Sequence, residues 1–292
     1  MTENTSDENS RYWREYWEWA AQQRRKDRGP MQSGFWDRMA GRYSEKDPAD
    51  REEPRLDAAF DLIESTGLGL SGAEVLDIGA GTGSLAIPLA RRGARVTAVD
   101  FSAGMLKQLE ERAAREGVSI ARTIHASWDE IDLDAEGLRG QFNLVIASMT
   151  PAVRCPVTFS LMQEAAKELC YYKGWVNREW DPAFYELYRL LFDEEFPVNS
   201  HGLSFPLVDL YLKGYRPTIR IEQEEWRSEE TVDDMVERVS GFFSSTKDID
   251  EAMKDRMREY LRERARGGKY LSKTVATTGM MIWDVRARCG NF

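Results

Sequence analysis

Three glycines at alternate positions lie in a short stretch of the chain, Asp77-x-Gly79-x-Gly81-x-Gly83, directly after a run of residues that favour β-structure. Glycine lets a backbone turn sharply and come close to a ligand, because no Cβ stands in the way. A helical pattern begins directly after this stretch, and the start of a helix offers unpaired N–H groups and the positive end of a dipole. The spacing therefore predicts a strand, a glycine-rich turn and a helix that together hold a polar, nucleotide-like ligand.

An acidic residue follows the next predicted strand. Residues 95–99 alternate like a strand, and Asp100 comes at its carboxyl end. A carboxylate at such a position can accept hydrogen bonds from the ribose hydroxyls of a nucleotide. Ser102 is suited to cap the helix that follows, while Phe101 and Met105 can pack against the face of an adenine ring. The glycine spacing differs from the Gly-x-Gly-x-x-Gly of dinucleotide enzymes.

Together these motifs resemble class I S-adenosylmethionine (SAM)-dependent methyltransferases, over residues 34–175. The resemblance implies an α/β, Rossmann-like fold, with a mostly parallel seven-stranded sheet and helices on both faces. It also implies SAM as the cofactor and S-adenosyl-L-homocysteine as its product. The residues expected to bind the cofactor lie in the glycine turn and after the neighbouring strands: Asp77, Gly79, Ala80, Gly81, Thr82, Gly83, Asp100, Phe101, Ser102, Met105, Ser127, Trp128 and Ser148.

Two turns of this sequence depart from patterns found in the family. Members usually carry an acidic residue after the third strand that binds the adenine amine, but the matching place here holds Ser127, with Trp128 beside it. A serine oxygen or a backbone carbonyl would then have to accept that hydrogen bond. After the fourth strand comes Met149-Thr150-Pro151 in place of the Asn-Pro-Pro-aromatic motif of enzymes that methylate base amines. That difference disfavours a nucleic-acid base as the acceptor.

The elements that must position these residues alternate regularly along the chain. Strands are predicted near 73–79, 95–99, 118–124, 142–148 and 169–176, with helices near 84–92, 102–116 and 157–169. Such alternation requires a parallel sheet with right-handed crossovers. Ligands of these sheets bind outside the carboxyl ends of the strands, so we expect one site at one edge of the sheet.

Aromatic residues recur at helical spacing ahead of the sheet. Residues 1–9 are expected to be disordered, whereas Trp13, Tyr16 and Trp17 lie on one face of a helix predicted over 11–28. Two interpretations remain open. The aromatic rings either pack on the sheet domain or form a lid over the acceptor pocket, where ring faces could also hold a cationic substrate.

A second aromatic segment runs from Phe35 to Tyr43 with the pattern Phe-Trp-Asp-x-x-Ala-x-x-Tyr. It resembles a segment of small-molecule methyltransferases that closes over the cofactor. By that resemblance Trp36 and Tyr43 are pocket candidates, and the alternative is that both are ordinary core residues.

The family signature fades beyond residue 176. Beyond it, helices are predicted over 184–196 and over a long segment, 228–267, that is interrupted near 244–246. Strands are predicted over 218–226 and 273–285. One further helix, over 54–65, is predicted ahead of the glycine turn. Sheets of this family close with an antiparallel pair, and helices inserted around the last strands usually cap the acceptor. We therefore expect an N-terminal tail and helical lid (1–45), a SAM-binding core (46–180), an inserted cap with late sheet elements (181–267), and a final strand with the C-terminus (268–292).

Composition restricts the partners. The 292-residue chain carries a formal charge of −10, which disfavours a broad nucleic-acid or anionic-membrane footprint. Its 3 cysteines show no paired spacing, so neither disulfides nor a zinc site is indicated. The polar N-terminus is unlike a signal peptide, and no apolar run reaches the length of a membrane span. We predict a cytoplasmic protein that binds no metal, and its oligomeric state stays open.

The predicted function is methyl transfer from SAM to a small-molecule acceptor. Because the sulfonium is already activated, the enzyme mainly has to align acceptor, methyl and sulfur. His201 is the one histidine of the predicted cap and a candidate base; the alternative is a loop histidine without a catalytic role. The expected acceptor wall consists of Trp17, Trp36, Tyr43, Met149, Thr150 and Trp175. The alternatives are methylation of a tRNA, a protein, or a thiol or metalloid acceptor, and a SAM-binding regulator without catalysis.

Overall fold

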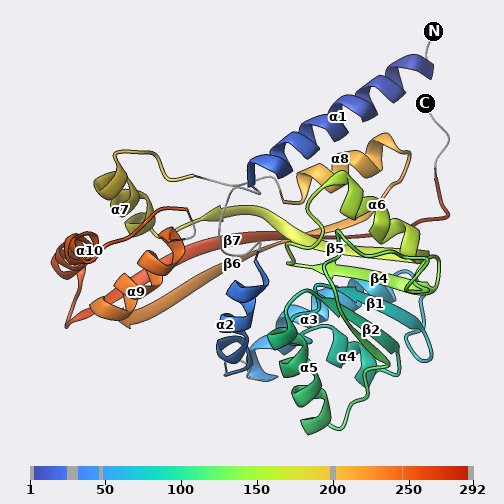
Figure 1. Ribbon diagram of the computed structural model, residues 1–292, viewed down its shortest axis with the longest axis horizontal. Helices are drawn as coiled ribbons and strands as arrows, with labels where there is room; N and C mark the ends of the chain where they lie inside the picture. The colour runs from blue at the N-terminus through green and yellow to red at the C-terminus, as the bar shows by residue number, and fades with distance from the viewer. Residues whose placement is uncertain (1–2, 25–31, 46–48, 198–201, 245, 289–292) are drawn as a thin grey trace.

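The structure is a computed structural model that describes residues 3–24, 32–45, 49–197, 202–244 and 246–288. Within these residues seven strands form one sheet in the order β3-β2-β1-β4-β5-β7-β6 (Figure 1). The strands are β1 (Glu74–Ile78), β2 (Arg95–Asp100), β3 (Arg122–His125), β4 (Phe142–Ser148), β5 (Ala166–Glu179), β6 (Thr218–Thr231) and β7 (Lys269–Asp284). Strands β1 to β5 are parallel, and β7 is antiparallel to both of its neighbours. This topology confirms the predicted Rossmann-like sheet and its final antiparallel pair.

Helices cover both faces of the sheet (Figure 1). One face packs against α3 (Ala49–Glu64), α4 (Ala86–Arg91) and α5 (Ala103–Arg115); the other packs against α1 (Glu3–Arg24), α6 (Pro156–Ala165) and α8 (Ser204–Leu212). The strands β1 and β4 are buried on both faces, which is why their sequences are nearly continuous apolar runs. A further helix, α2 (Ser33–Glu45), lies beside α5.

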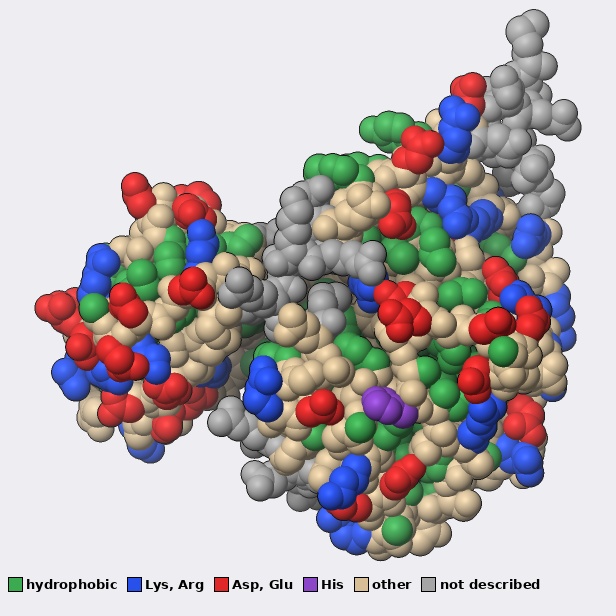
Figure 2. Space-filling view, in the orientation of Figure 1, with side chains coloured by type: hydrophobic (Ala, Val, Ile, Leu, Met, Phe, Trp, Pro, Cys, Tyr) green, Lys and Arg blue, Asp and Glu red, His purple; other side chains and the backbone are tan. Residues whose placement is uncertain are grey.

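The three strands β5, β7 and β6 extend well beyond the rest of the sheet. They contain 14, 16 and 14 residues, whereas β4 has 7. At the far end the extension carries α7 (Pro182–Phe192), α9 (Val232–Phe243) and α10 (Glu251–Arg264), which form a separate aromatic-rich cluster. We call this part the helical lobe and the rest the core lobe; a narrow waist between them is visible in Figure 2.

Several predicted boundaries were wrong, each for a local reason. Helix α1 begins at Glu3, inside the segment expected to be disordered, and its early acidic residues suit the positive end of the helix dipole. The strand β6 continues to Thr231 because it pairs with β7 along its whole length, so the predicted helical segment starts at Val232 and not at 228. The predicted strand 118–124 shortens to Arg122–His125.

Three further differences lie in the second half of the chain. Helix α7 ends at Phe192 because Asp193 takes a left-handed conformation (φ 53°) that a helix cannot continue. Helix α8 was not among the predicted elements. The final strand begins at Lys269, after the left-handed Gly267 and Gly268.

Candidate active site at the carboxyl edge of the sheet

The glycine turn follows β1 as predicted, and its glycines serve different purposes. Gly79, Gly81 and Gly83 all have positive φ angles, of 67°, 56° and 85°, which L-residues rarely adopt. A Cβ on Gly79 would overlap the hydroxyl of Thr150, and one on Gly83 would press on Leu109, so both glycines allow close packing. A Cβ on Gly81 would meet no protein atom within 4 Å. This open side is where a ligand can approach the turn.

Asp100 joins the glycine turn to the end of β2. Its Oδ2 accepts a hydrogen bond from the Gly81 N–H at 2.8 Å, and its Oδ1 accepts one from the Ser102 N–H at 2.9 Å. Burial raises the pKa of this carboxyl, while the two N–H groups act in the opposite direction. Each carboxylate oxygen can accept a second hydrogen bond, so Asp100 can bind a ligand hydroxyl without releasing the backbone.

Asp77, at the end of β1, is buried to 3% exposure. Burial, together with the negative charge of Asp100, raises the pKa of Asp77 to about 7, and a hydrogen bond from the Ala86 N–H offsets this only in part. An approaching cation would favour the ionised form of such a group. Asp77 is therefore suited to a positively charged part of a ligand.

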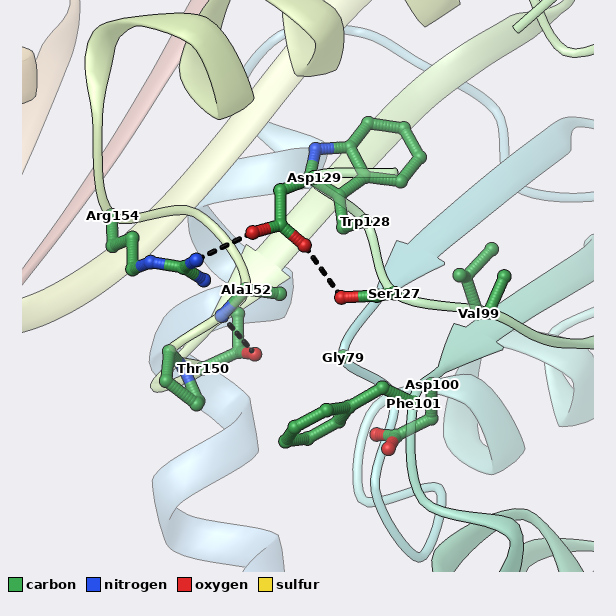
Figure 3. A pocket seen from close by; sticks show the side chains of 12 residues that line it. Gly79, Val99, Asp100, Phe101, Ser127, Trp128, Asp129, Thr150, Ala152 and Arg154 are labelled. Carbon is green, nitrogen blue, oxygen red and sulfur yellow. Dashed lines mark hydrogen bonds and ion pairs between the residues drawn. The ribbon is translucent and has the colours of Figure 1, made fainter. Parts of the chain in front are cut away.

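A pocket with an open volume of about 450 Å³ lies between these strand ends and the turns after β3 and β4. Figure 3 shows the carboxylate of Asp129 on its wall, accepting a hydrogen bond from Ser127 Oγ–H and pairing with Arg154. Burial would raise the pKa of Asp129, but Ser127 and Arg154 together hold it below its usual value. The pocket is lined by Gly79, Val99, Asp100, Phe101, Ala126, Ser127, Trp128, Asp129, Thr150, Pro151, Ala152 and Arg154.

The structure brings six of the sequence-predicted residues together around this pocket: Gly79, Asp100, Phe101, Ser127, Trp128 and Thr150. The indole of Trp128 is nevertheless buried in the core, where it donates to the Thr158 carbonyl at 3.0 Å. Ala80 and Thr82 are buried within the turn. Ser148 ends β4 opposite Lys173.

The helix after β2 holds two other predicted residues away from the pocket lining. The Ser102 side chain caps α5, as expected, by accepting a hydrogen bond from the Met105 N–H. Met105 itself is buried on α5. Neither residue is among those that line the pocket.

Trp17 was predicted to line the acceptor pocket, and the structure corrects this. Its side chain is 3% exposed and stacks on Phe205 of α8, with ring centroids 5.7 Å apart. Its indole N–H donates to the Arg154 carbonyl at 2.8 Å. Trp13 packs on Phe205 as well, so these two rings of α1 pack against the core lobe, as the first interpretation expects. The lid over the acceptor stays a prediction.

The other acceptor-wall candidates come from separate elements of the fold. Trp36 lies on α2, half-buried and edge-on to Phe35, and Tyr43 lies near the end of the same helix. Met149, 36% exposed, takes a left-handed conformation with φ 51°. Trp175 lies on the extension of β5. His201 lies outside the described residues.

Asp129 and Arg154 were missed by sequence reasoning. Asp129 stands two residues after Ser127, so a search for the acidic residue within a wider turn would have found it. Arg154 had no such signal, because its role depends on a turn that folds back towards β3. Among the described residues no group of three or more His, Cys, Asp or Glu could hold a metal ion. Nor is any described helix long and apolar enough to cross a membrane.

The strand order, the glycine turn after β1 and the acidic residue at the end of β2 define a class I methyltransferase fold. Residues 75–170 match the family model described as "Methyltransferase domain". Residues 75–170 therefore correspond to a methyltransferase domain, and the sheet that contains them has the class I methyltransferase fold.

Among curated proteins, the chain is 44% identical over 70 residues to the demethylmenaquinone methyltransferase of Thermobifida fusca, covering 22% of this chain and 30% of that protein. It is 46% identical over 54 residues to an uncharacterized protein of Haemophilus influenzae, covering 18% and 20%. The chain thus spans between a fifth and a third of the length of these relatives.

Two solved structures are similar in fold. Magnesium protoporphyrin IX methyltransferase from Synechocystis, with bound SAH, is 15% identical with a TM-score of 0.46, covering 77% of this chain and 81% of that one. A putative sarcosine dimethylglycine methyltransferase from Galdieria sulphuraria is 16% identical with a TM-score of 0.47, covering 83% and 89%.

Proposed function

We propose that the protein transfers a methyl group from SAM to a small-molecule acceptor. The observation that carries this proposal is the joined arrangement of the glycine turn and Asp100, with the open side of Gly81, at the pocket edge of a methyltransferase domain. When bound, SAM supplies a methyl group on a sulfonium centre that is already activated for transfer. The protein then has to bind, orient and shield the reactants.

Four groups of the chain suit the parts of this cofactor. Asp77 would hold its ammonium group, since a nearby cation stabilises the ionised carboxylate. Asp100 would accept from the ribose hydroxyls, and Phe101 would pack on the adenine face. Asp129, in the turn after β3, would supply the acidic acceptor for the adenine amine that is missing at position 127.

The acceptor would bind beside the cofactor, against the turn after β4 and the extension of β5. Lys173 pairs with Ser148 at the end of β4, and Trp175 lies two residues further, about 7 Å along the strand. The Trp175 ring contacts Trp226 of β6, with ring centroids 5.8 Å apart. Met149, Thr150 and Trp175 would thus form one wall, without any contribution from Trp17.

Charge favours a small acceptor over a nucleic acid. The chain has a formal charge of −10, and on the face shown in Figure 2 the described acidic and basic side chains are interspersed on both lobes, without a continuous basic stripe. A nucleic-acid site would need a cluster of positive charge along its path.

Turnover of SAM tests this function. A cell extract is divided by ultrafiltration into a small-molecule filtrate and a macromolecular retentate, and formation of S-adenosylhomocysteine is measured with each. We expect product with the filtrate alone. Product only with the retentate would show a macromolecular acceptor, and SAM binding without turnover in either fraction would indicate a regulator.

A further inference from the structure

The structure assigns a positioning role to Asp37, an acidic residue of α2 that does not line the pocket. Its Oδ1 accepts two hydrogen bonds from the start of α5, one from Ser102 Oγ–H at 2.6 Å and one from the Gly104 N–H at 3.0 Å. We propose that this contact, which we call the α2 latch, holds Ser102 and Asp100 in the arrangement that binds the nucleoside part of the cofactor. The proposal rests on the proposed function.

The latch is the first link of a continuous chain of hydrogen bonds. Ser102 Oγ accepts from the Met105 N–H at 3.1 Å, so its own hydrogen is left to point at Asp37. The Ser102 N–H donates to Asp100 Oδ1 at 2.9 Å, and Asp100 Oδ2 accepts from the Gly81 N–H at 2.8 Å. Four segments, namely α2, the start of α5, the end of β2 and the glycine turn, are therefore tied together.

The close approach of α2 depends on a glycine. A Cβ on Gly104 would lie 3.1 Å from both the Cα and the Oδ1 of Asp37, which is tighter than ordinary van der Waals contact. Two hydrogen bonds lower the pKa of Asp37; the one from Ser102 has the larger effect, and the one from the Gly104 N–H has the next largest. Hydrogen bonds to an ionised acceptor are stronger than those between neutral groups.

Loss of the latch should therefore loosen residues that line the pocket. Phe101 lies between Asp100 and Ser102 in the chain and forms part of the pocket lining. When Ser102 is no longer held from α2, both Phe101 and the Asp100 carboxylate gain freedom that a bound nucleoside has to restrict again. This cost falls on ligand affinity and residence time, whereas Asp37, on the surface of α2, contributes little to the core.

The first test compares Asp37→Ala and Asp37→Asn with Asp57→Ala, an exposed aspartate of α3. S-adenosylhomocysteine is the probe, with affinity from calorimetry and dissociation from stopped-flow fluorescence. Asp37→Ala should raise the Kd about 5- to 30-fold, as for loss of hydrogen bonds to a charged group, mainly through faster dissociation. Asp37→Asn retains an acceptor oxygen and should stay within about 3-fold of the wild type, like the Asp57 control.

A double-mutant cycle with Ser102→Gly makes the test specific. Glycine is the chosen replacement because it is tolerated at a helix N-cap. If the latch acts through Ser102, the double variant Asp37→Ala/Ser102→Gly should bind the probe about as well as the weaker single variant. Fully additive losses, or wild-type affinity in Asp37→Ala, would overturn the latch. Failure of the wild-type protein to bind the probe would instead overturn the proposed function itself.

Discussion

Two buried aspartates, one in each lobe, are equally hidden from solvent but differ in what surrounds them. Asp77 in the core lobe and Asp181 in the helical lobe are each 3% exposed. Asp181 accepts hydrogen bonds from the Ala183 N–H, the Tyr270 hydroxyl and the Lys273 N–H, all within 2.9 Å. Asp77 has its pKa raised to about 7 by burial and by the nearby Asp100.

Under the proposed function, this difference distinguishes a structural acid, Asp181, from one that would bind a ligand, Asp77. The Asp181 carboxylate closes the start of α7 onto β7, and its partners all belong to the protein. Asp77 lies next to a second carboxyl and a turn with an open side. Its ionised form would therefore be stabilised by a cationic group of a ligand bound there. Strained or destabilised groups of this kind concentrate at functional sites.

The largest effect is expected from Asp181→Ala. Removing this carboxylate leaves buried donors from three residues without their acceptor, which should lower the free energy of unfolding by about 3–5 kcal/mol. Urea denaturation measures the loss, and Glu179→Ala, an exposed acid on the same strand extension, serves as the control. The affinity for S-adenosylhomocysteine should be unchanged in the folded variant; a parallel loss of affinity would mean that the two lobes are not separable in function.

Asp77→Asn should instead raise the free energy of unfolding. A carboxyl with a folded pKa of about 7 and an unfolded pKa near 3.9 binds more protons in the folded state between these values, so stability falls as pH rises through this window. Above pH 7 the buried carboxylate is charged, and it lowers the free energy of unfolding by its full amount. The asparagine variant should therefore be more stable than the wild type by about 1–4 kcal/mol at pH 8.

The same variant supplies its own control at lower pH. The gain in the free energy of unfolding should fall to about half at pH 5.5, in the middle of this window, and should largely disappear near pH 4, where the unfolded carboxyl is protonated too. Cofactor affinity should fall more at pH 8 than at pH 5.5, because at the lower pH the wild-type carboxyl must first lose its proton before it can pair with a cation. A stability gain that does not vary with pH would show that burial of charge is not its cause.

The smallest effect concerns two residues that share an unusual backbone conformation. Met149 beside the pocket has φ 51°, and Asp193 at the end of α7 has φ 53°. Glycine accepts this conformation at less cost, so Met149→Gly and Asp193→Gly should each raise the free energy of unfolding by up to about 1 kcal/mol. Only Met149→Gly should also reduce methyl transfer, by about 10-fold, because it removes a side chain that would contact the acceptor. Equal activity in both variants would remove Met149 from the acceptor wall.

The core lobe was largely predictable because its signals are local. The strand–turn–helix around Gly79 and the strand 142–148, which matches β4 (Phe142–Ser148), follow from apolar runs and glycines that act over a few residues. Ser102 as the cap of α5 follows from the same short-range physics. The strand order followed from the regular alternation of elements.

What the sequence could not reveal depends on contacts between distant residues. The aromatic periodicity of α1 shows that one face is buried but not against which surface, and Trp17 turned out to pack on Phe205, far along the chain. The pair of Asp129 and Arg154 likewise joins two separate turns. The full length of β6 is set by its pairing with β7, which no local propensity specifies.

Under the proposed function the cofactor binds at the open side of the glycine turn, and calorimetry of S-adenosylhomocysteine binding can detect this. Gly81 and Gly67 both have positive φ, of 56° and 81°, and a Cβ on either would meet no protein atom within 4 Å. Gly67→Val therefore reproduces the backbone strain of Gly81→Val at a position away from the pocket. We expect the Gly67 variant to bind like the wild type and the Gly81 variant to lose at least about 100-fold in affinity, because its side chain fills the ligand's space. Wild-type affinity in Gly81→Val would show that the cofactor does not bind at this turn.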